Sequence, residues 1–255
     1  MIGILGGMGP HAGALLVERL TALHHAACRD QDHPRVLLYS NSKIPNRVDA
    51  ILGRGPSPVP EIIDSLDLLA RGGAQFAAIA CNTAHVFLDE IRARATLPVI
   101  DMIATASARL AHEGVARIGL LATEGTVRSG VYQQLLGAAG IEVVVPEVHD
   151  QTRVSAAIYD PQRGVKARAT ELDPYTLAEL AQVAERLLVR RRVQALLVAC
   201  TELSIAFRHP SLATLPSLDA LDELAHACLA RVGIARNVDG HLPPDVLPPH
   251  PMEIQ

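Results

Sequence analysis

Two cysteines stand at matching places in this sequence, and a thiol is a side chain that can exchange a proton with a substrate. Cys81 follows the apolar run that ends in Ile79-Ala80, and Cys200 follows the one that ends in Val198-Ala199. In each case the next residues are polar and can begin a helix. A thiol there meets free backbone N–H groups and the positive end of the helix dipole, which both favour the thiolate. Both cysteines are therefore candidates for acid–base chemistry.

Other motifs repeat at nearly the same spacing as the cysteines. The two thiols are 119 residues apart (200 − 81), the glycine-containing strands that begin at Ile2 and Ile118 are 116 apart (118 − 2), and Leu97-Pro98 and Leu215-Pro216 are 118 apart (215 − 97). Three motifs in the same order, with offsets that agree within three residues, indicate an internal duplication.

Short apolar strands alternate with amphipathic helices, which is typical of a parallel sheet covered on both faces. We predict an α/β protein with two similar doubly wound parallel-sheet domains related by a pseudo-two-fold axis. Ligands of such sheets lie beyond the carboxyl ends of the strands, so the axis directs both thiols into one cleft between the domains. The alternative is two unrelated domains whose cysteines only fill helix starts. In the first half we expect strands at 2–5, 36–39, 76–80 and 98–101, and helices at 12–27, 61–70 and from 82 to about 94.

Three uses of the thiols are open at this point. In a two-base mechanism, one thiolate removes a proton from carbon while the opposing thiol protonates the other face, so that the configuration inverts. Cys81 with His85 and Cys200 could instead hold a metal ion, or His85 could serve as the base for a nucleophilic cysteine. The second half has Ser204 where His85 would recur, and a single nucleophile leaves one cysteine without a purpose. We therefore predict the two-base use, with no metal.

Arg47 and Lys166 lie in loop-like stretches and are 119 residues apart (166 − 47), the same offset as the cysteines. A lone basic loop residue is usually solvated, but two cations at matching positions predict a cleft that receives the anionic ends of a small substrate. Glu202 either pairs with a substrate ammonium or sets the environment of Cys200, unless it is an ordinary first-turn helix residue. The full set of candidate substrate-binding residues is Met8, Gly9, Arg47, Asn82, Thr83, Thr123, Thr126, Lys166, Thr201 and Glu202.

The glycine turn at Gly7-Met8-Gly9 invites a nucleotide-binding interpretation, because with Gly13 it approximates a dinucleotide fingerprint after a first strand. However, the second strand ends in Ser40-Asn41 and offers no acidic residue to hold a ribose. We expect these glycines to let the backbone approach a small ligand, and we expect no cofactor.

Composition excludes several other classes. A formal net charge of −4 is not that of a nucleic-acid-binding protein, and no apolar segment is long enough to suggest a membrane span or a signal peptide. The four cysteines form no C-x-x-C pair, so we expect reduced thiols in the cytoplasm. Five prolines in the last fifteen residues predict an extended tail.

Four motifs in order resemble the aspartate/glutamate racemase family: IGILGGMGP at 2–10, ACNTAH at 80–85, GLLAT-x-GT at 119–126 and ACTE at 199–202. The IPNR segment that ends at Arg47 and the RGVK segment that ends at Lys166 are similar to the aspartate-racemase branch. Glutamate racemases of the wider family carry an Asp-Ser-Gly turn and a Cys-Thr-His motif. This chain has Gly6-Gly7-Met8 and Cys200-Thr201-Glu202 in those places.

The resemblance implies a racemase that works without pyridoxal phosphate, uses Cys81 and Cys200 as its two acid/bases, and forms a homodimer. It implies a small acidic amino acid as substrate, aspartate before glutamate. It also implies that residues 1–103 and 215–235 form the first domain and 104–214 the second, followed by the tail at 236–255. Two alternatives stay open: a maleate isomerase or arylmalonate decarboxylase of the same superfamily, or a dicarboxylate-binding protein without catalysis.

Overall fold

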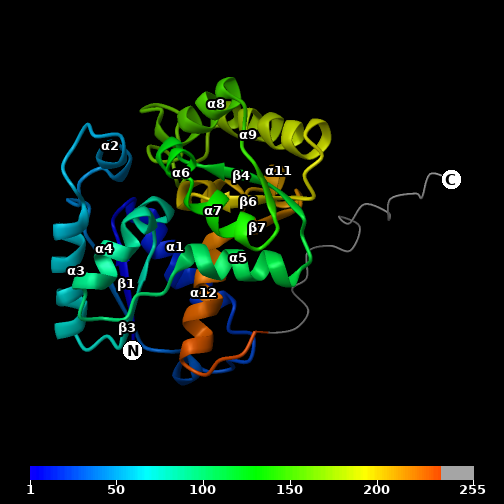
Figure 1. Ribbon diagram of the computed structural model, residues 1–255. Helices are drawn as coiled ribbons and strands as arrows, with labels where there is room; N and C mark the ends of the chain where they lie inside the picture. The colour runs from blue at the N-terminus through cyan, green and yellow to red at the C-terminus, as the bar shows by residue number, and fades with distance from the viewer. Residues whose placement is uncertain (237–255) are drawn as a thin grey trace.

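The computed structural model describes residues 1–236, so nearly all of the tail expected at 236–255 lies outside the described residues. The described chain contains two parallel β-sheets with helices around them (Figure 1). Strand order is β2-β1-β3 in the first sheet and β5-β4-β6-β7 in the second. The strands are β1 Ile2–Gly6, β2 Val36–Ser40, β3 Phe76–Ile79, β4 Arg117–Ala122, β5 Glu142–Val144, β6 Ala195–Ala199 and β7 Ser217–Asp219.

The helices connect these strands in the expected alternation. They are α1 Pro10–Ala22, α2 Arg47–Ile51, α3 Val59–Arg71, α4 Leu88–Arg94, α5 Met102–His112, α6 Glu124–Ser129, α7 Val131–Ala138, α8 Val148–Tyr159, α9 Pro174–Glu185, α10 Thr201–Ala206, α11 Pro210–Ala213 and α12 Ala220–Arg231, with 3-10 turns η1 Asp30–Asp32 and η2 Asn82–Phe87 and a π turn η3 Arg186–Arg190. The helix expected from 82 to 94 is thus a 3-10 turn followed by α4, and α1 ends five residues earlier than expected.

The two sheets repeat one plan, as the duplication predicted. The first strand of each half is central, with the second strand on one side and the third on the other. The central strand β1 and the third strands β3 and β6 are buried along their whole length. Strands of a parallel sheet that is covered on both faces read as continuous apolar runs, and these do.

The segment after Leu215 was expected to belong to the first domain. Its strand, β7, pairs with β6 in the second sheet. In the first half, Val99 makes a single parallel bridge to Ala77, at the matching position, in place of the strand expected at 98–101. In each half the Leu-Pro segment therefore returns beside the third strand of that half, as the strand β7 in the second half and as a single bridge in the first.

The helices that follow these two segments, α5 and α12, each contact the other half of the molecule. Helix α12 packs against α1 of the first half and against α5, while α5 packs against α7 of the second half. Figure 1 shows α12, in orange, near α1 and α5. Apart from the pairing of β7, the domain boundaries expected at 103/104, 214/215 and 235/236 remain predictions.

A shared apolar core fixes the two sheets relative to each other. One continuous cluster of buried side chains runs from Ile2 and Ile4 of β1 to Ile118 and Leu120 of β4, with residues of α5 and α12 between them. Each fully buried aliphatic side chain of this kind stabilises the fold by about 1.5–3 kcal/mol. A joint of many such residues holds the strand ends of both sheets in one arrangement.

Candidate active site

Both cysteines stand where a buried strand turns into a helix. Cys81 follows β3 and caps η2, and Cys200 follows β6 and caps α10. Their backbones are alike, with φ −160° and ψ 111° at Cys81 and φ −151° and ψ 128° at Cys200. Both thiols are buried, at 5% and 3% exposure. The duplication thus gives the two thiols equivalent local structures.

The two thiols line one small cavity, which has an empty volume of about 280 Å³ and takes side chains from both halves. Ten of the residues chosen from the sequence line it, and three further residues do. Its lining is Met8, Asn46, Arg47, Val48, Cys81, Asn82, Thr83, Thr123, Tyr159, Lys166, Cys200, Thr201 and Glu202.

Two predicted residues, Gly9 and Thr126, lie just outside the lining. The backbone N–H of Gly9 donates to Glu202 Oε1 at 3.2 Å. A Cβ atom at Gly9 would stand 2.9 Å from that oxygen, so the glycine makes room for a side chain of the protein. Gly7 has φ +96° and lies against the backbone of Asn41, so the close approach expected there is also to protein.

Sequence reasoning missed Asn46, Val48 and Tyr159. Asn46 precedes Arg47 and caps α2, since its Oδ1 accepts from the backbone N–H of Val48 at 2.9 Å. Tyr159 ends α8, with Lys166 Nζ 5.7 Å from its ring centroid. Asn46 lies within the IPNR motif that ends at Arg47, and this position could have indicated it; Tyr159 precedes the RGVK motif by four residues, which is a weaker signal. Val48 gives no such signal.

Glu202 is the most connected side chain of the site. Its Oε1 accepts from Lys166 Nζ at 2.5 Å and from the Gly9 N–H, and its Oε2 accepts from Cys200 Sγ at 3.3 Å and from Thr201 Oγ1 at 3.4 Å. It is 6% exposed. A buried carboxylate is costly unless it is paired and hydrogen-bonded, and here every oxygen has partners. Glu202 therefore joins a cation to one of the thiols.

The environment of Cys200 opposes the thiolate, contrary to the sequence-based expectation. Burial raises the pKa of the Cys200 thiol well above its ordinary value, and the negative charge of Glu202 raises it further, while Lys166 acts in the opposite direction. Burial and the charge of Glu202 therefore have a larger effect on the pKa of Cys200 than the helix start, which favours the thiolate. Cys200 is therefore a protonated thiol at neutral pH, which is the form that can give a proton.

Arg47 is bound to its own loop and to the glycine turn, and its buried Nε–H is left for a ligand. Its Nη1 donates to the carbonyl oxygens of Ile44 and Pro45 at 3.1 and 2.8 Å, and its Nη2 donates to that of Met8 at 3.0 Å. Its buried Nε has no partner within the described chain. The guanidinium thus holds the loop and the glycine turn together and can still bind an anion.

Replacing Arg47 with lysine should lower kcat/KM about tenfold for the small anionic substrate that the sequence predicts, because lysine keeps the charge but cannot hold three carbonyls and an anion with one planar group. Initial rates at several substrate concentrations give this ratio. The exposed Arg54, which pairs with Asp49, supplies the control in Arg54→Lys, expected to be silent. Unchanged kcat/KM in Arg47→Lys would remove Arg47 from the site.

Three threonine hydroxyls join the halves behind the cavity. Thr83 and Thr123 are 3.0 Å apart, Thr123 and Thr126 are 3.0 Å apart, and Thr126 donates to Thr83 at 3.1 Å. Thr126 is fully buried, and its hydroxyl is engaged in this triangle. It therefore positions the other two and does not face the cavity.

We expect Thr126→Val to cost about 1 kcal/mol of stability, since it removes one hydroxyl from a buried network, and to lower Tm by about 2–4 °C. Activity should fall less than tenfold. Thermal unfolding followed by circular dichroism measures the first effect. The control is Thr152→Val on α8, where the hydroxyl is exposed and binds only its own helix. Equal Tm shifts in both variants would contradict the shared network.

His85 does not contact a sulfur atom. Its Nδ1 lies 2.9 Å from the carbonyl oxygen of Cys81 and its Nε2 lies 3.4 Å from that of Ile100. Burial lowers its pKa, so the ring is neutral. In the second half, Ser204 donates to the carbonyl of Cys200 at 3.4 Å and to Asp219 at 2.7 Å. The residue four positions after each cysteine thus supports that strand end, and residues 1–236 contain no cluster of three or more His, Cys, Asp or Glu that could hold a metal.

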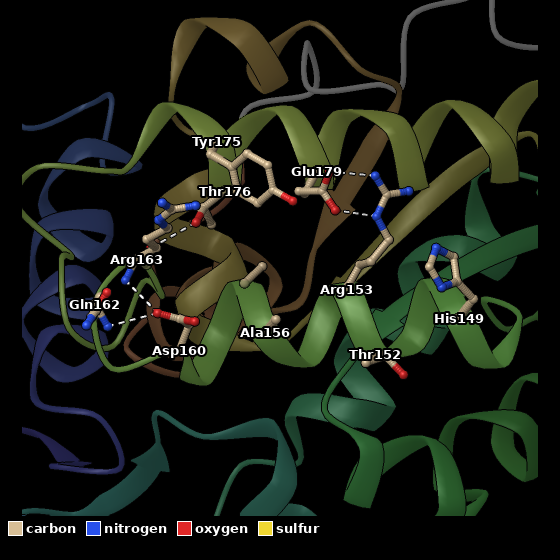
Figure 2. A pocket seen from close by; sticks show the side chains of 11 residues that line it. His149, Thr152, Arg153, Ala156, Asp160, Gln162, Arg163, Tyr175, Thr176 and Glu179 are labelled. Atoms are coloured by element: carbon tan, nitrogen blue, oxygen red, sulfur yellow. Dashed lines mark hydrogen bonds and ion pairs between the residues drawn. The ribbon is translucent and has the colours of Figure 1, made fainter.

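A larger hollow lies between α8 and α9, with an empty volume of about 1170 Å³ (Figure 2). Arg153 and Glu179 form an ion pair on its wall, and the Arg163 guanidinium lies 5.1 Å from the ring centroid of Tyr175. Neither cysteine borders it. Because the reactive groups are in the smaller cavity, we place the active site there despite the difference in size.

Comparison with known proteins finds similar sequences and similar structures. The family model described as Asp/Glu/Hydantoin racemase matches residues 5–228. The broad specificity amino-acid racemase RacX of Bacillus subtilis (strain 168) is 28% identical over 236 residues, which are 91% of this chain and 95% of that protein. Within the described residues, no helix is long and apolar enough to cross a membrane.

Solved structures share the fold. The Picrophilus torridus aspartate racemase is 32% identical with a TM-score of 0.78, covering 92% of this chain and 95% of that one. Glutamate racemase from Francisella tularensis subsp. tularensis SCHU S4, in complex with D-glutamate, is 18% identical with a TM-score of 0.62, covering 94% and 84%, and is similar in fold alone. The resemblance and the two-domain α/β fold predicted from the sequence are confirmed, and the chain belongs to the Asp/Glu/hydantoin racemase family as an amino-acid racemase.

Proposed function

We propose that this racemase interconverts the enantiomers of aspartate, with Cys81 and Cys200 as its two proton-transfer groups and no pyridoxal phosphate. The observation that carries the proposal is that two thiols with equivalent backbone geometry, one from each half, line the same cavity. Two groups related by an approximate two-fold axis can act on opposite faces of one carbon, which inversion requires.

One turnover moves two protons. The thiolate of one cysteine takes the proton from Cα, and the electron pair left behind spreads into the α-carboxylate. The thiol of the other cysteine then protonates Cα on its opposite face and becomes the thiolate. Because Glu202 and burial keep Cys200 protonated in the resting protein, we assign Cys200 as the proton donor in one direction of the reaction. The reverse reaction uses the opposite assignment.

The charges in the cavity suit a dicarboxylic amino acid. Arg47 offers its free Nε to one carboxylate, and Lys166 can bind the other once it leaves Glu202, which then accepts the substrate ammonium. The buried amide of Asn82 stands beside Cys81 and can bind the α-carboxylate as its charge grows. Such donors, fixed in a closed cavity, offset the weak acidity of the Cα–H bond.

The relative named an aspartate racemase supports aspartate over glutamate. The relative named a broad specificity amino-acid racemase supports the alternative, which is a wider range of amino-acid substrates. Incubation of the protein in D₂O with single enantiomers of aspartate, glutamate and neutral amino acids tests both, with loss of the Cα–H signal followed by NMR and the product enantiomer by chiral chromatography.

Each outcome of that experiment has one meaning. If only aspartate shows exchange with inversion, the proposal is supported. If neutral amino acids react at equal rates, the enzyme has a broad substrate range and is not specific for aspartate. Inert amino acids with conversion of added maleate favour the isomerase alternative. Ligand-induced thermal stabilisation without turnover favours a binding protein.

The family resemblance also supports a homodimer in the cytoplasm. Sedimentation velocity should give a species of about twice the 27.2 kDa chain mass. A monomer at micromolar concentration would contradict it.

A further inference from the structure

The amide of Asn82 is only half-satisfied by the protein. Asn82 follows Cys81, is 2% exposed and lines the cavity. Its Oδ1 accepts a hydrogen bond, but its buried Nδ2 has no partner within the described residues. Buried polar groups are nearly always paired, so an unpartnered amide at the edge of a cavity indicates a group that a ligand completes.

The bond to Oδ1 comes from the other half of the molecule. The phenol of Tyr132, on α7, donates to Asn82 Oδ1 at 2.5 Å. Tyr132 is fully buried, and this is the phenol's one hydrogen bond within residues 1–236. Desolvation raises the pKa of Tyr132 well above its ordinary value, so the phenol keeps its proton and serves as a donor.

This contact decides which end of the amide faces the cavity. An asparagine side chain can turn by half a rotation and exchange its oxygen and nitrogen at little cost in shape. In the turned orientation the phenol proton of Tyr132 would lose its acceptor, and Oδ1 would face an incoming carboxylate. Both changes are unfavourable, because a buried donor is left unpaired and two acceptors meet.

We propose that Tyr132 is a positioning residue of the racemase, which fixes the Asn82 amide so that Nδ2 points at the substrate carboxylate beside Cys81. This inference rests on the proposed function only in that the ligand is an amino acid. Because α7 belongs to the second half and Asn82 to the first, the amide is oriented only while the two halves are docked.

A double-mutant cycle on Tyr132→Phe and Asn82→Ala tests the proposal, with L-aspartate and D-aspartate as probes. Tyr132→Phe alone should raise KM and lower kcat/KM about 3- to 10-fold. In the Asn82→Ala background, the same change should cause no further loss. Equal losses in the two backgrounds would mean that Tyr132 acts through general packing, and would overturn the proposal.

Two further measurements keep the result interpretable. Tyr175→Phe, a change of the same kind at an exposed tyrosine, is the matched control and should leave KM unchanged. In the unaltered protein, the side-chain ¹⁵N–H₂ signal of Asn82, assigned by its loss in Asn82→Ala, should shift when L-aspartate is added. An unshifted signal at saturating aspartate would overturn the assignment without reference to any variant.

The proposal and the proposed function fail separately. Additive losses in an active racemase would remove Tyr132 and leave the cysteine mechanism intact. Full activity in the cysteine variants, with coupling between Tyr132 and Asn82, would remove the cysteine mechanism and leave the positioning role.

Discussion

Replacing Cys81 with alanine should abolish racemisation of aspartate, and replacing Cys200 should do the same. In the proposed mechanism each thiol performs one of the two proton transfers, and loss of a positioned acid or base costs on the order of 10²- to 10⁴-fold. The two enantiomers have equal free energies, so kcat/KM must fall equally in both directions. Polarimetry or chiral chromatography gives the rates, and circular dichroism checks the fold.

The exposed Cys28 and the buried Cys228 provide the controls. Cys28→Ala should keep full activity, because this thiol lies outside the cavity. Cys228→Ala empties a site in the shared core, so it should lower Tm without changing kcat/KM at low temperature. If Cys81→Ala or Cys200→Ala retained full activity, the two-base mechanism would be wrong.

Each single-cysteine variant should keep a partial reaction that identifies the face on which its thiol lies. A remaining thiolate can remove the Cα proton of one enantiomer and return a deuteron from D₂O to the same face, which exchanges hydrogen without inversion. Cys200→Ala should therefore exchange one enantiomer and Cys81→Ala the other. Exchange of the same enantiomer by both variants would place the two sulfurs on one side of the substrate.

The sequence could predict the groups that line the cavity because the duplication places them. Cys81 and Cys200, and Arg47 and Lys166, recur at one spacing, and repetition of a strand–turn–helix unit puts equivalent residues at equivalent strand ends. The sequence also predicts β1 and β3, because a strand that is covered on both faces appears as an unbroken run of apolar residues.

Contacts between distant segments could not be predicted in the same way. The apolar pattern of Leu215-Pro216 fits the edge of either sheet, and only packing selects β6 as the partner of β7. Tyr132 lies in a helix that looks like ordinary core, and its hydrogen bond to Asn82 is visible only when the halves are together. The charge state of Cys200 depends on which way the Glu202 carboxylate turns, which no spacing reveals.

Replacing Glu202 with glutamine should lower kcat/KM for aspartate roughly 10- to 100-fold, because Lys166, Gly9 and Cys200 lose a charged partner that all three share. The pH dependence should change as well. The proposed mechanism needs one thiol and one thiolate, so we expect activity to be lost at high pH as the Cys200 thiol ionises. Glu202 and burial hold that pKa above its ordinary value.

Removing the carboxylate takes away the negative charge that raises the pKa of Cys200 beyond the effect of burial, and it leaves the positive charge of Lys166 unopposed. Both changes favour the thiolate, so the alkaline limb of the pH–rate profile of Glu202→Gln should move to lower pH. Glu202→Asp keeps the charge and should retain the position of this limb despite a lower rate. Gly9→Ala keeps every charge but places a methyl group 2.9 Å from Glu202 Oε1, so it should reduce the rate by displacing the carboxylate. If the alkaline limb of Glu202→Gln stayed in place, the charge of Glu202 would not control the ionisation of Cys200. The assignment of Cys200 as the proton donor of the resting protein would then lose the support of that charge.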